Sequence, residues 1–309
     1  MSIIQSTSII AAHPKTGAAI KQHRLNVKPR ATDEFGKLKV VAVCSPKALW
    51  WDPNDKETLI NGWEAENPPP ITAKTLEEHK RMVDVMRSHG VEVVEIGPVD
   101  GLVESTYTRD WGVAIDKKFY KSRMFKNVRK PEPDQIAVPG EVRFEENEYL
   151  EGGDVLLPRK DMLFVGYGPR TSMAAVQRLK KEVGREVISF QIDPSEMHLD
   201  CGLAVFPGGH ALMYPGAFAD PQGSLEQVKK LFPHVEILDK EAYKGMGTNV
   251  QFLDEETMFT GNSQISKILR KWKFNPIYQT FFELHKGGGS YRCCTLPLVR
   301  EESGIYTIY

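Results

Sequence analysis

The sequence lacks the features that mark nucleic-acid-binding, membrane and secreted proteins. Its 309 residues carry 40 Lys and Arg against 41 Asp and Glu, so no basic excess indicates a nucleic-acid partner. Its longest apolar runs are far short of the roughly 20 residues that a membrane helix needs. The first residues lack the charged start and long apolar core of a secretory signal. These absences predict a soluble, cytoplasmic globular protein without nucleic-acid or membrane partners.

Cysteine is also scarce. The chain has four, at positions 44, 201, 293 and 294, which are too few for a disulfide scaffold. None of them forms a CxxC pair of the kind used for zinc or redox chemistry. Reduced thiols in the cytoplasm fit this pattern best.

The last two cysteines lie in the most distinctive segment, KGGGSYRCCTLPLVRE at 286–301. Glycines at 287–289 allow the backbone to approach a ligand closely, and Arg292 beside the sulfur favours the thiolate form. The segment therefore predicts a nucleophile at the rim of a pocket. A vicinal disulfide and a pair of buried structural thiols remain open as alternatives, since free cysteine is among the most buried residue types.

The chain divides into an arm and a body. Residues 1–35 are polar and basic with weak periodicity, which predicts a flexible or peripheral N-terminal arm, and residues 36–309 are expected to form one catalytic domain. A strand at Lys39–Ser45 opens the body. A Trp- and Pro-rich loop follows, with WWDPND and GWEAENPPP, and loops of this length in a compact domain are often functional.

The body then repeats one unit, an amphipathic helix followed by a short β-branched strand. The helices are expected at Ala73–His89, Thr171–Val183, Ser224–Leu231 and Asn262–Lys271, and the strands are VEVVEIG, EVISFQI, HVEIL and FNPIYQ. A fifth unit is expected at Arg123–Pro139, although KNVRKPEPDQ is a poor helix sequence. Strands and helices repeated in this way predict an α/β architecture.

A polar cluster follows each unit and opens the next strand. The clusters are STYTRDWG, YLEGGDVLL, EMHLDCGLAVF, KGMGTNVQF and the glycine-rich segment with the paired cysteines. If the units surround an axis, these clusters converge on one pocket.

The residues in these clusters suit one type of chemistry. A thiolate with a histidine is a nucleophile with a proton shuttle. Several carboxylates suit a cationic substrate, and a guanidinium pairs bidentately with carboxylates. Arg170 has the charge to hold a substrate carboxylate, so the set predicts a zwitterion with a guanidinium, such as arginine. The set consists of Asp110, Glu151, Asp154, Arg170, His198, Asp200 and Cys293.

Taken singly, each of these residues has a simpler interpretation. Asp110 could pair with Arg109 on the surface, Glu151 to Asp154 could form a plain turn, and Arg170 could begin a helix. The i, i+2 spacing of His198 and Asp200 places them on one face of a strand. That spacing also suits a metal, although no third nitrogen or sulfur ligand is nearby.

Five motifs together carry a family resemblance. TRDWG, LEGGDVLL, GPRTS, HLD and GGGSYRCCTLPL, in this order, resemble the guanidine-modifying enzymes of the pentein fold, from about Lys39 to the C-terminus. That superfamily includes arginine deiminase, dimethylarginine dimethylaminohydrolase and the amidinotransferases. The resemblance implies a five-bladed α/β propeller of ββαβ units around a pseudo-five-fold axis, in agreement with the repeat.

The resemblance also implies a role for each residue. Cys293, not Cys294, aligns with the nucleophile, and Cys294 is the second candidate. His198 is implied as the general acid and base, with Glu151 orienting it. The residues implied to bind substrate are Asp110 and Asp200 on the guanidinium, Arg170 on the α-carboxylate, and Asp154, which also supports its strand.

These roles imply a cysteine-dependent hydrolase that acts on the guanidinium of arginine or an Nω-substituted arginine through an amidino-thiouronium intermediate. The alternative is an amidinotransferase that moves the amidino group to an amine, and a third option is a non-enzymatic binding protein on the same scaffold. The implied partner is a small-molecule guanidine, with no metal and no organic cofactor. A homo-oligomer is among the open oligomeric states.

Some positions depart from the relatives. Gly287 to Gly289 stand where arginine deiminases carry a further arginine, and EGGD favours the hydrolases over the glycine amidinotransferases. The segment Asn61-Gly62-Trp63 resembles arginine dihydrolases, which have an asparagine where this chain has Asp110.

Overall fold

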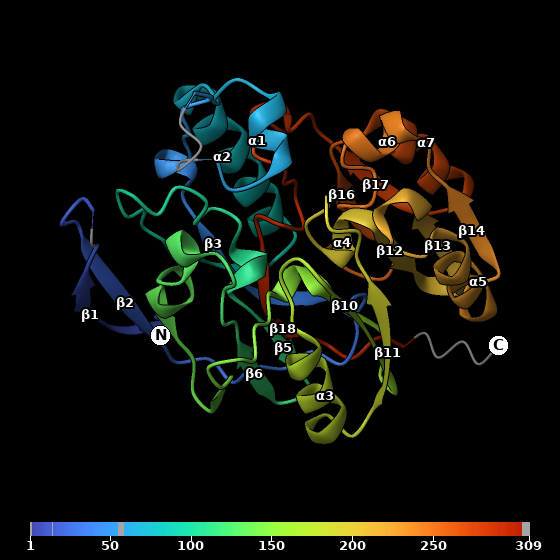
Figure 1. Ribbon diagram of the computed structural model, residues 1–309, viewed down its shortest axis with the longest axis horizontal. Coiled ribbons are helices and arrows are strands. Elements are labelled where there is room, and N and C mark those ends of the chain that lie inside the picture. The colour runs from blue at the N-terminus through green and yellow to red at the C-terminus, as the bar shows by residue number, and fades with distance from the viewer. Residues whose placement is uncertain (1, 14, 55–58, 305–309) are drawn as a thin grey trace.

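The computed structural model describes residues 2–13, 15–54 and 59–304, so residues 55–58 of the Trp- and Pro-rich loop lie outside the described part (Figure 1). Within that part the strands form six three-stranded sheets. In spatial order, the sheets consist of β1 (Ile4–Ala12), β2 (Ala19–Leu25) and β7 (Ile136–Ala137); β18 (Leu296–Arg300), β3 (Leu38–Cys44) and β4 (Glu92–Ile96); β5 (Gly112–Ile115), β6 (Lys118–Lys121) and β8 (Glu141–Arg143); β9 (Val155–Arg159), β10 (Met162–Tyr167) and β11 (Glu186–Gln191); β12 (Leu203–Phe206), β13 (His210–Met213) and β14 (His234–Ile237); β15 (Gln251–Phe252), β16 (Thr257–Thr260) and β17 (Asn275–Tyr278).

All six sheets share one plan. The middle strand pairs antiparallel with one neighbour and parallel with the other. Parallel neighbours need a crossover connection, usually a helix, and four of the sheets have one between the middle strand and its parallel partner. Figure 1 shows α3, α5 and α7 toward the outside of the molecule. The helices are α1 (Gly62–Glu66), α2 (Thr72–Ser88), α3 (Met173–Glu182), α4 (Leu199–Gly202), α5 (Pro221–Leu231), α6 (Lys240–Lys244), α7 (Ser263–Lys271) and α8 (Phe282–His285).

The four predicted helix–strand units are confirmed. α2, α3, α5 and α7 lie within three residues of their expected bounds, and the strands that follow them are β4, β11, β14 and β17. Local sequence explains the starts of these helices. The side chains of Ser172 and Asn262 accept hydrogen bonds from the first backbone N–H groups of α3 and α7, as N-cap residues do.

The fifth unit is present without an α-helix. Between β6 and β8 the chain forms two 3-10 helices, at Asn127–Arg129 and Glu132–Gln135. Pro131 and Pro133 lack the backbone N–H that an α-helix would need there. The low helix propensity of this segment is therefore confirmed, and the parallel strand of this sheet is β8, beyond the expected segment.

The expected N-terminal arm consists of two parts. β1 and β2 form an exposed antiparallel hairpin at the edge of the molecule (Figure 1). The chain then turns inward: Arg30 donates its N–H to Leu298, and Arg300 donates its own to Arg30. Residues 31–35 are largely buried, and one of them, Glu34, reaches the turn that carries Cys293. β18 pairs with β3, so the two ends of the body are joined in one sheet.

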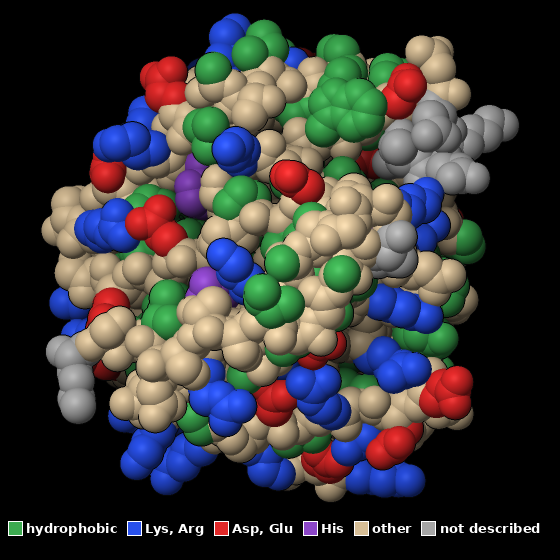
Figure 2. All heavy atoms as spheres, turned by 90° about the vertical axis from the view of Figure 1, so that its left-hand side faces the viewer, with side chains coloured by type: hydrophobic (Ala, Val, Ile, Leu, Met, Phe, Trp, Pro, Cys, Tyr) green, Lys and Arg blue, Asp and Glu red, His purple; other side chains and the backbone are tan. Residues whose placement is uncertain are grey.

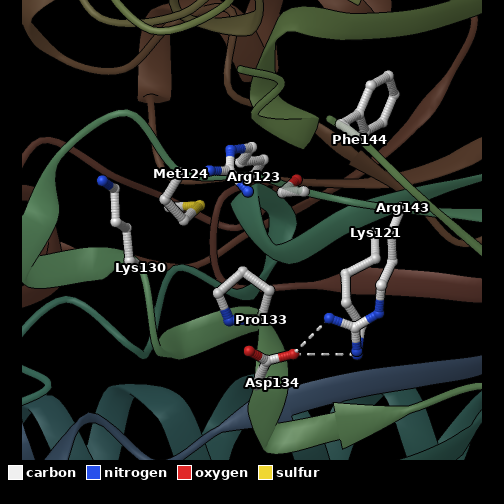
Figure 3. A pocket seen from close by; sticks show the side chains of 9 residues that line it. Lys121, Arg123, Met124, Lys130, Pro133, Asp134, Arg143 and Phe144 are labelled. Carbon is white, nitrogen blue, oxygen red and sulfur yellow. Dashed lines mark ion pairs between the residues drawn. The ribbon is translucent and has the colours of Figure 1, made fainter. Parts of the chain in front are cut away.

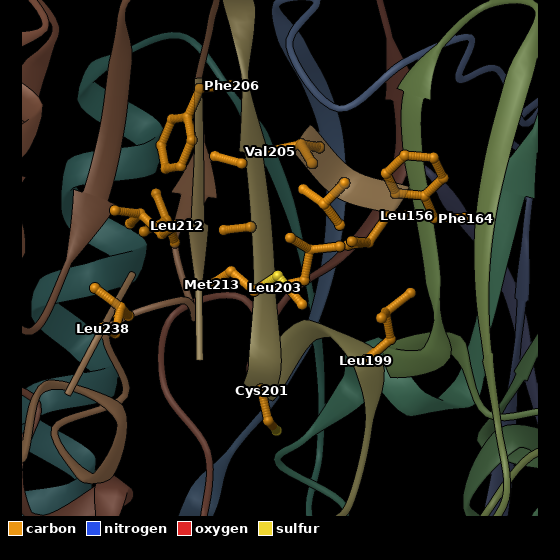
Figure 4. Packing of buried hydrophobic residues seen from close by; sticks show 14 of the residues in the cluster. Leu156, Phe164, Leu199, Cys201, Leu203, Val205, Phe206, Leu212, Met213 and Leu238 are labelled. Carbon is orange, nitrogen blue, oxygen red and sulfur yellow. The ribbon is translucent and has the colours of Figure 1, made fainter. Parts of the chain in front are cut away.

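The largest hydrophobic cluster fills the space between neighbouring sheets. Figure 4 shows Phe164 of β10 on one side, Leu212 of β13 on the other, and Leu203 of β12 between them. All three side chains are fully buried. Burial of such side chains against a second layer stabilises the fold by about 2 kcal/mol each, and it holds the turns that precede β9 and β12 in place.

The surface shows no segregation of charge on the face that carries the hairpin. In Figure 2, basic and acidic side chains are interspersed there with scattered hydrophobic ones. Among the described residues, no helix has the length and apolar character needed to cross a membrane.

Candidate active site

The predicted polar clusters lie where expected, in short turns just before strands. The turns are the 3-10 helices Thr108–Trp111 before β5 and Gly152–Asp154 before β9, α4 before β12, residues 245–250 before β15, and the turn 291–294 before β18. They also meet in space. Arg109 donates its N–H to the carbonyl of Cys293 at 2.9 Å, and side-chain contacts join the other turns.

Cys293 is held by Asn249. The Asn249 side-chain amide donates to Cys293 Sγ at 3.0 Å, and its Oδ1 accepts the backbone N–H of Cys293 at 3.1 Å. The thiol is 4% exposed. A Cβ at Gly289 would lie 3.1 Å from Cys293 Cβ and would collide with the ring of Tyr107, so a side chain at this position would displace Cys293 or Tyr107.

The other thiols lie in different surroundings. All four cysteines are free, so the vicinal disulfide is not formed. Cys294 is fully buried among hydrophobic side chains, and burial raises the pKa of its thiol well above the usual value. A hydrogen bond to Cys293, together with burial, raises the pKa of Cys201 in the same direction.

His198 lies between two carboxylates. Its Nε2 is 2.8 Å from Glu151 Oε2, and its Nδ1 is 3.7 Å from Asp110 Oδ1. Burial alone would lower the pKa of His198, but the charges of Asp110 and Glu151 outweigh burial and raise the pKa to about 10. At neutral pH the ring is therefore an imidazolium, which can give up a proton.

Glu151 is fixed in its ionised form. Arg170 Nη1 lies 3.2 Å from Glu151 Oε2, and the backbone N–H of Phe125 donates to Glu151 Oε1 at 3.0 Å. Burial alone would raise the pKa of Glu151, but Arg170 and His198 lower it to about 2. Arg170 is 4% exposed, and its guanidinium uses part of its hydrogen-bonding capacity on Glu151.

Asp110 carries an oxygen without a hydrogen-bond partner. Its Oδ2 lies 2.8 Å from Arg129 Nη1, whereas Oδ1 is buried and accepts no hydrogen bond in the described part of the chain, since His198 Nδ1 is 3.7 Å away. The surface ion pair with Arg109 is not formed, because Asp110 is 3% exposed and Arg109 Nη2 donates to Gln251. A Cβ at Gly153 would lie 2.8 Å from Asp110 Oδ1 and 2.9 Å from His198 Cγ. Glycine at this position of EGGD leaves room for both groups.

The two remaining aspartates make structural contacts. Asp154 Oδ1 accepts the backbone N–H of Leu199 at 2.9 Å, which anchors the residue after His198, and burial raises its pKa to about 6. Asp200 Oδ2 accepts from Arg292 Nε at 3.1 Å. The expectation that His198 and Asp200 share a strand face is wrong, since His198 is the extended residue before α4 and Asp200 lies within that helix.

Arg292 turns away from the sulfur beside it in sequence. Its Nη1 and Nη2 donate to Glu34 at 2.6 and 3.0 Å, in a buried bidentate pair. Burial alone would raise the pKa of Glu34, but Arg292 lowers it to about 2. The chain therefore positions the turn that carries Cys293 by an ion pair between residues 258 positions apart.

Sequence reasoning missed three of the residues in this assembly. Asn249 lies in KGMGTNVQF, and membership of that repeated polar cluster was the available signal. Glu34 lies in the segment 1–35 that the sequence predicts as an arm, and Arg129 lies in the poorly helical segment. Arg129 is 2% exposed and also pairs with Glu104 and Glu132, at 3.1 and 2.8 Å.

A short helix covers the glycine-rich approach to Cys293. Asn61, the residue before α1, donates to Glu104 Oε1 at 2.7 Å and to the carbonyl of Gly287 at 3.1 Å. Gly288 has φ of 87°, and a Cβ there would lie 3.1 Å from the ring of Trp63. α1 and the glycine run are thus in direct contact.

Among the described residues, one group of side chains has ligand atoms close enough for a metal ion. Atoms of Asp110, Glu151 and His198 lie within 4.8 Å of one another. In this structure these side chains form an ion-paired cluster, in which His198 lies between the two carboxylates, Arg129 pairs with Asp110 and Arg170 pairs with Glu151.

Comparison with known proteins gives consistent matches. The family model described as N,N dimethylarginine dimethylhydrolase, eukaryotic, matches residues 53–300. The uncharacterized protein YkgA of Bacillus subtilis is 30% identical over 279 residues, which cover 87% of this chain and 94% of YkgA. The N(G),N(G)-dimethylarginine dimethylaminohydrolase of Mycobacterium tuberculosis is 27% identical over 259 residues, which cover 77% of this chain and 80% of that protein.

Solved structures show the same fold at lower identity. The N-terminal domain of ArgZ, an arginine dihydrolase from the ornithine-ammonia cycle in cyanobacteria, matches with a TM-score of 0.74 and 20% identity, over 85% of this chain and 98% of that one. SxtG, an amidinotransferase from Microseira wollei, matches with a TM-score of 0.70 and 17% identity, over 91% of this chain and 99% of that one.

Proposed function

The chain belongs to the N,N dimethylarginine dimethylhydrolase family of guanidine-modifying enzymes, and we propose that it hydrolyses the guanidinium of arginine or an Nω-substituted arginine with Cys293 as nucleophile. The observation that carries this proposal is that the turn Thr108–Trp111 contacts both halves of the site. The N–H of Arg109 bonds the carbonyl of Cys293, whose thiol Asn249 clamps, and the neighbouring Asp110 pairs with the imidazolium of His198. A cationic guanidinium suits such a site because buried carboxylates attract it and ion-pair with it.

Asp110 is the proposed guanidinium anchor. Its Oδ1 is buried and accepts no hydrogen bond in the described structure, with His198 Nδ1 3.7 Å away, and a buried acceptor without a hydrogen bond costs about 1–3 kcal/mol. A guanidinium N–H would satisfy this oxygen and would bring the guanidinium carbon toward Cys293. Asp200 would contribute Oδ1, because Arg292 occupies Oδ2 and Oδ1 accepts only a thiol hydrogen bond from Cys201, at 3.7 Å.

Bond breaking follows from the same geometry. The Cys293 thiolate attacks the guanidinium carbon and forms a C–S bond, which gives a tetrahedral adduct. His198 transfers its proton to the departing nitrogen as the C–N bond breaks, and ammonia or an alkylamine leaves. A thiouronium remains on Cys293.

The second half of the reaction uses the neutral imidazole as a base. His198 takes a proton from water, and the resulting hydroxide adds to the thiouronium carbon. The C–S bond then breaks and restores the thiolate, and the added hydroxyl loses its proton to solvent as the ureido product forms. Glu151 orients the ring throughout, and Arg170 keeps Glu151 ionised and offers its remaining N–H groups to the substrate carboxylate.

We also propose that the sheets form a five-bladed propeller and that the protein is cytoplasmic. Five sheets, those beyond the N-terminal hairpin, repeat the antiparallel-then-parallel plan, which supports a five-bladed propeller around a pseudo-five-fold axis with the site at its centre. Four free thiols support a reducing, cytoplasmic location.

Product analysis in labelled water tests the function. The protein is incubated with arginine, asymmetric dimethylarginine and agmatine in H₂¹⁸O, and products are identified by mass. Hydrolysis predicts a ureido product that carries one ¹⁸O atom, and Cys293→Ser should yield none while Cys294→Ser remains active. Turnover by Cys293→Ser, or a product without label, would refute the mechanism.

Amidino transfer is the alternative, because a transferase uses an amine where the hydrolase uses water. Parallel incubations with glycine or lysine distinguish the two. Ornithine that forms only with an acceptor indicates transfer, whereas citrulline without an acceptor indicates hydrolysis.

A further inference from the structure

A second thiol lies beside the proposed nucleophile. Cys201 belongs to α4, the short helix that follows His198, and its side chain lies at one end of the hydrophobic cluster in Figure 4, beyond Leu203. Cys201 is 3% exposed, and its thiol hydrogen-bonds Cys293. Because Cys201 takes no part in the proposed hydrolysis, that reaction does not explain its contact with Cys293.

Asp200 holds the Cys201 thiol close to the turn that carries Cys293. Its Oδ1 accepts from Cys201 Sγ at 3.7 Å, and its Oδ2 accepts from Arg292 Nε at 3.1 Å. Arg292 is the residue before Cys293 in that turn. Since a thiol has one proton, Cys201 donates either to this carboxylate or to Cys293. One buried carboxylate therefore contacts both the thiol of α4 and the turn of the proposed nucleophile.

The segment before β15 connects the same two cysteines. Thr248 Oγ1 donates to the carbonyl of Cys201 at 2.5 Å, and the Asn249 amide donates to Cys293 Sγ at 3.0 Å. The two donors are neighbours in sequence, so they fix the positions of Cys201 and Cys293 relative to one another. These contacts agree with the direct hydrogen bond between the two thiols.

The other two cysteines have different partners. Cys294 is fully buried and hydrogen-bonds Thr106, and Cys44 Sγ donates to Ser105 Oγ at 3.6 Å. Neither thiol hydrogen-bonds Cys293 in the described part of the chain. Cys201 is therefore the thiol that is in place to react with Cys293.

The two neighbouring thiols differ in reactivity. The hydrogen bond to Cys293, together with burial, raises the pKa of Cys201 well above its usual value, so Cys201 is protonated at neutral pH. Thiolates rather than thiols react with oxidants. Cys293 acts as a thiolate in the proposed hydrolysis and is the sulfur that an oxidant attacks first; this order of events rests on the proposed function.

We propose that Cys201 and Cys293 form a reversible disulfide when a hydroperoxide such as hydrogen peroxide oxidises the site. Cys293 is the oxidised thiol, and Cys201 is the resolving thiol that traps it. Both thiols are free in this structure. The bond needs the sulfurs about 2.05 Å apart, so the two side chains rotate toward one another, and neither residue lies in a strand that would oppose this movement.

The oxidation consumes one peroxide for each disulfide. The Cys293 thiolate attacks one peroxide oxygen, the O–O bond breaks, hydroxide leaves, and the sulfur becomes a sulfenic acid. Cys201 then loses its proton and attacks the sulfenic sulfur, so that an S–S bond forms and the S–O bond breaks. The departing hydroxide takes up that proton as water. The disulfide blocks the proposed nucleophile and protects it from irreversible oxidation until a thiol reductant restores both thiols.

Peptide mapping of the full chain tests the proposal. The protein is treated with hydrogen peroxide, remaining thiols are blocked with iodoacetamide, and the chain is digested without reductant. A peptide pair joined through Cys201 and Cys293 is expected, lighter by two hydrogen atoms than the separate thiol peptides. Dithiothreitol should remove this product and return Cys293 as a thiol that iodoacetamide labels.

Two variants separate trapping by Cys201 from general oxidation. In Cys201→Ala the sulfenic acid has no resolving thiol, and excess peroxide carries it to sulfinic acid, which dithiothreitol does not reduce. The fraction of Cys293 that dithiothreitol returns as thiol should therefore fall roughly fivefold. Cys294→Ala is the matched control, because it removes a buried thiol beside Cys293 that is not the resolving one, and it should recover like the unmodified chain.

Met124 is an internal control for peroxide attack elsewhere in the interior. Figure 3 shows Met124 at a cavity of about 190 Å³ whose lining contains no cysteine. Met124 is 1% exposed, which makes it as buried as the two thiols. Oxidation converts methionine into a sulfoxide, and the joined peptide should form at peroxide concentrations that leave Met124 unoxidised.

Three results would overturn the proposal: no peptide joined through Cys201 and Cys293, an equal yield of peptides joined through Cys294, or equal recovery of Cys293 in Cys201→Ala and Cys294→Ala. None of these measurements needs turnover. A chain that forms the disulfide but hydrolyses no guanidine would refute the proposed function alone. A chain that hydrolyses a guanidine without forming the disulfide would refute the disulfide alone.

Discussion

Replacing Asn249 offers the sharpest test of how Cys293, the proposed nucleophile, is held. Its amide bonds both the backbone and the sulfur of Cys293. Because a backbone N–H can only donate, the amide oxygen must face it, and the NH₂ group must face the sulfur. Asn249→Asp keeps the shape and the oxygen but places a second oxygen, with a negative charge, against the sulfur. Asn249→Ala removes both contacts without adding charge.

The magnitudes follow from the distances. Asn249→Ala loses a hydrogen bond to the reacting sulfur and leaves a buried N–H unpaired, which together should lower kcat/KM roughly 10- to 100-fold. In Asn249→Asp, two like charges about 3 Å apart repel by about 5 kcal/mol at an effective dielectric constant of about 20. That repulsion corresponds to a loss of roughly several thousandfold. The isosteric variant is therefore expected to be the worse of the two.

Two assays separate chemistry from folding. One is kcat/KM with the best guanidine substrate, and the other is the rate of iodoacetamide inactivation at about pH 7, which follows the nucleophilicity of the thiol. Asn275→Asp is the matched control, because Asn275 is exposed on β17, and it should leave both rates unchanged. An Asn249→Asp variant that is as active as Asn249→Ala, with intact thermal unfolding in both, would show that the amide does not contact the reacting sulfur.

Three further predictions concern stability and labelling. The pKa of His198 in the folded protein, about 10, exceeds its usual value of 6.5. The stabilising effect of the protonated ring is therefore complete below pH 6.5 and is lost as pH rises toward 10. The drop in thermal midpoint from about pH 7 to 10 should be smaller in His198→Gln than in the unmodified chain, and an equal drop would contradict the raised pKa. Glu34→Gln should lower the free energy of unfolding by about 3 kcal/mol, because it removes the bidentate carboxylate partner of the buried Arg292 and leaves only Asp200 to offset its charge. Glu301→Gln, in an exposed pair, should cost less than about 1 kcal/mol. Equal losses in urea titrations would count against the buried pair. Cys294→Ala should retain kcat and lose about 1 kcal/mol of stability, and peptide mapping after brief iodoacetamide treatment should find no label on Cys294 in the unmodified chain.

Much of the fold could be predicted from the sequence because it depends on local patterns. The helix–strand units lie within three residues of their predicted places, since apolar spacing and N-cap residues are properties of short segments. The recurrence of polar clusters also predicted that side chains from distant segments would meet. The prediction for the turn that carries His198 is wrong, because HLD has the alternation of a strand while the chain there forms the short helix α4.

The partners within the site were decided only by the tertiary structure. The sequence by itself determined the repeated unit, the polar turns before the strands and the glycines beside the thiol. It carried no signal that Glu34 would pair with Arg292, or that Asn249 rather than Arg292 would contact the Cys293 sulfur. Residues this far apart in sequence have no fixed spacing that could reveal their contact. The direction of a long side chain depends on which charges the packed sheets bring within reach, and only the folded chain specifies those charges.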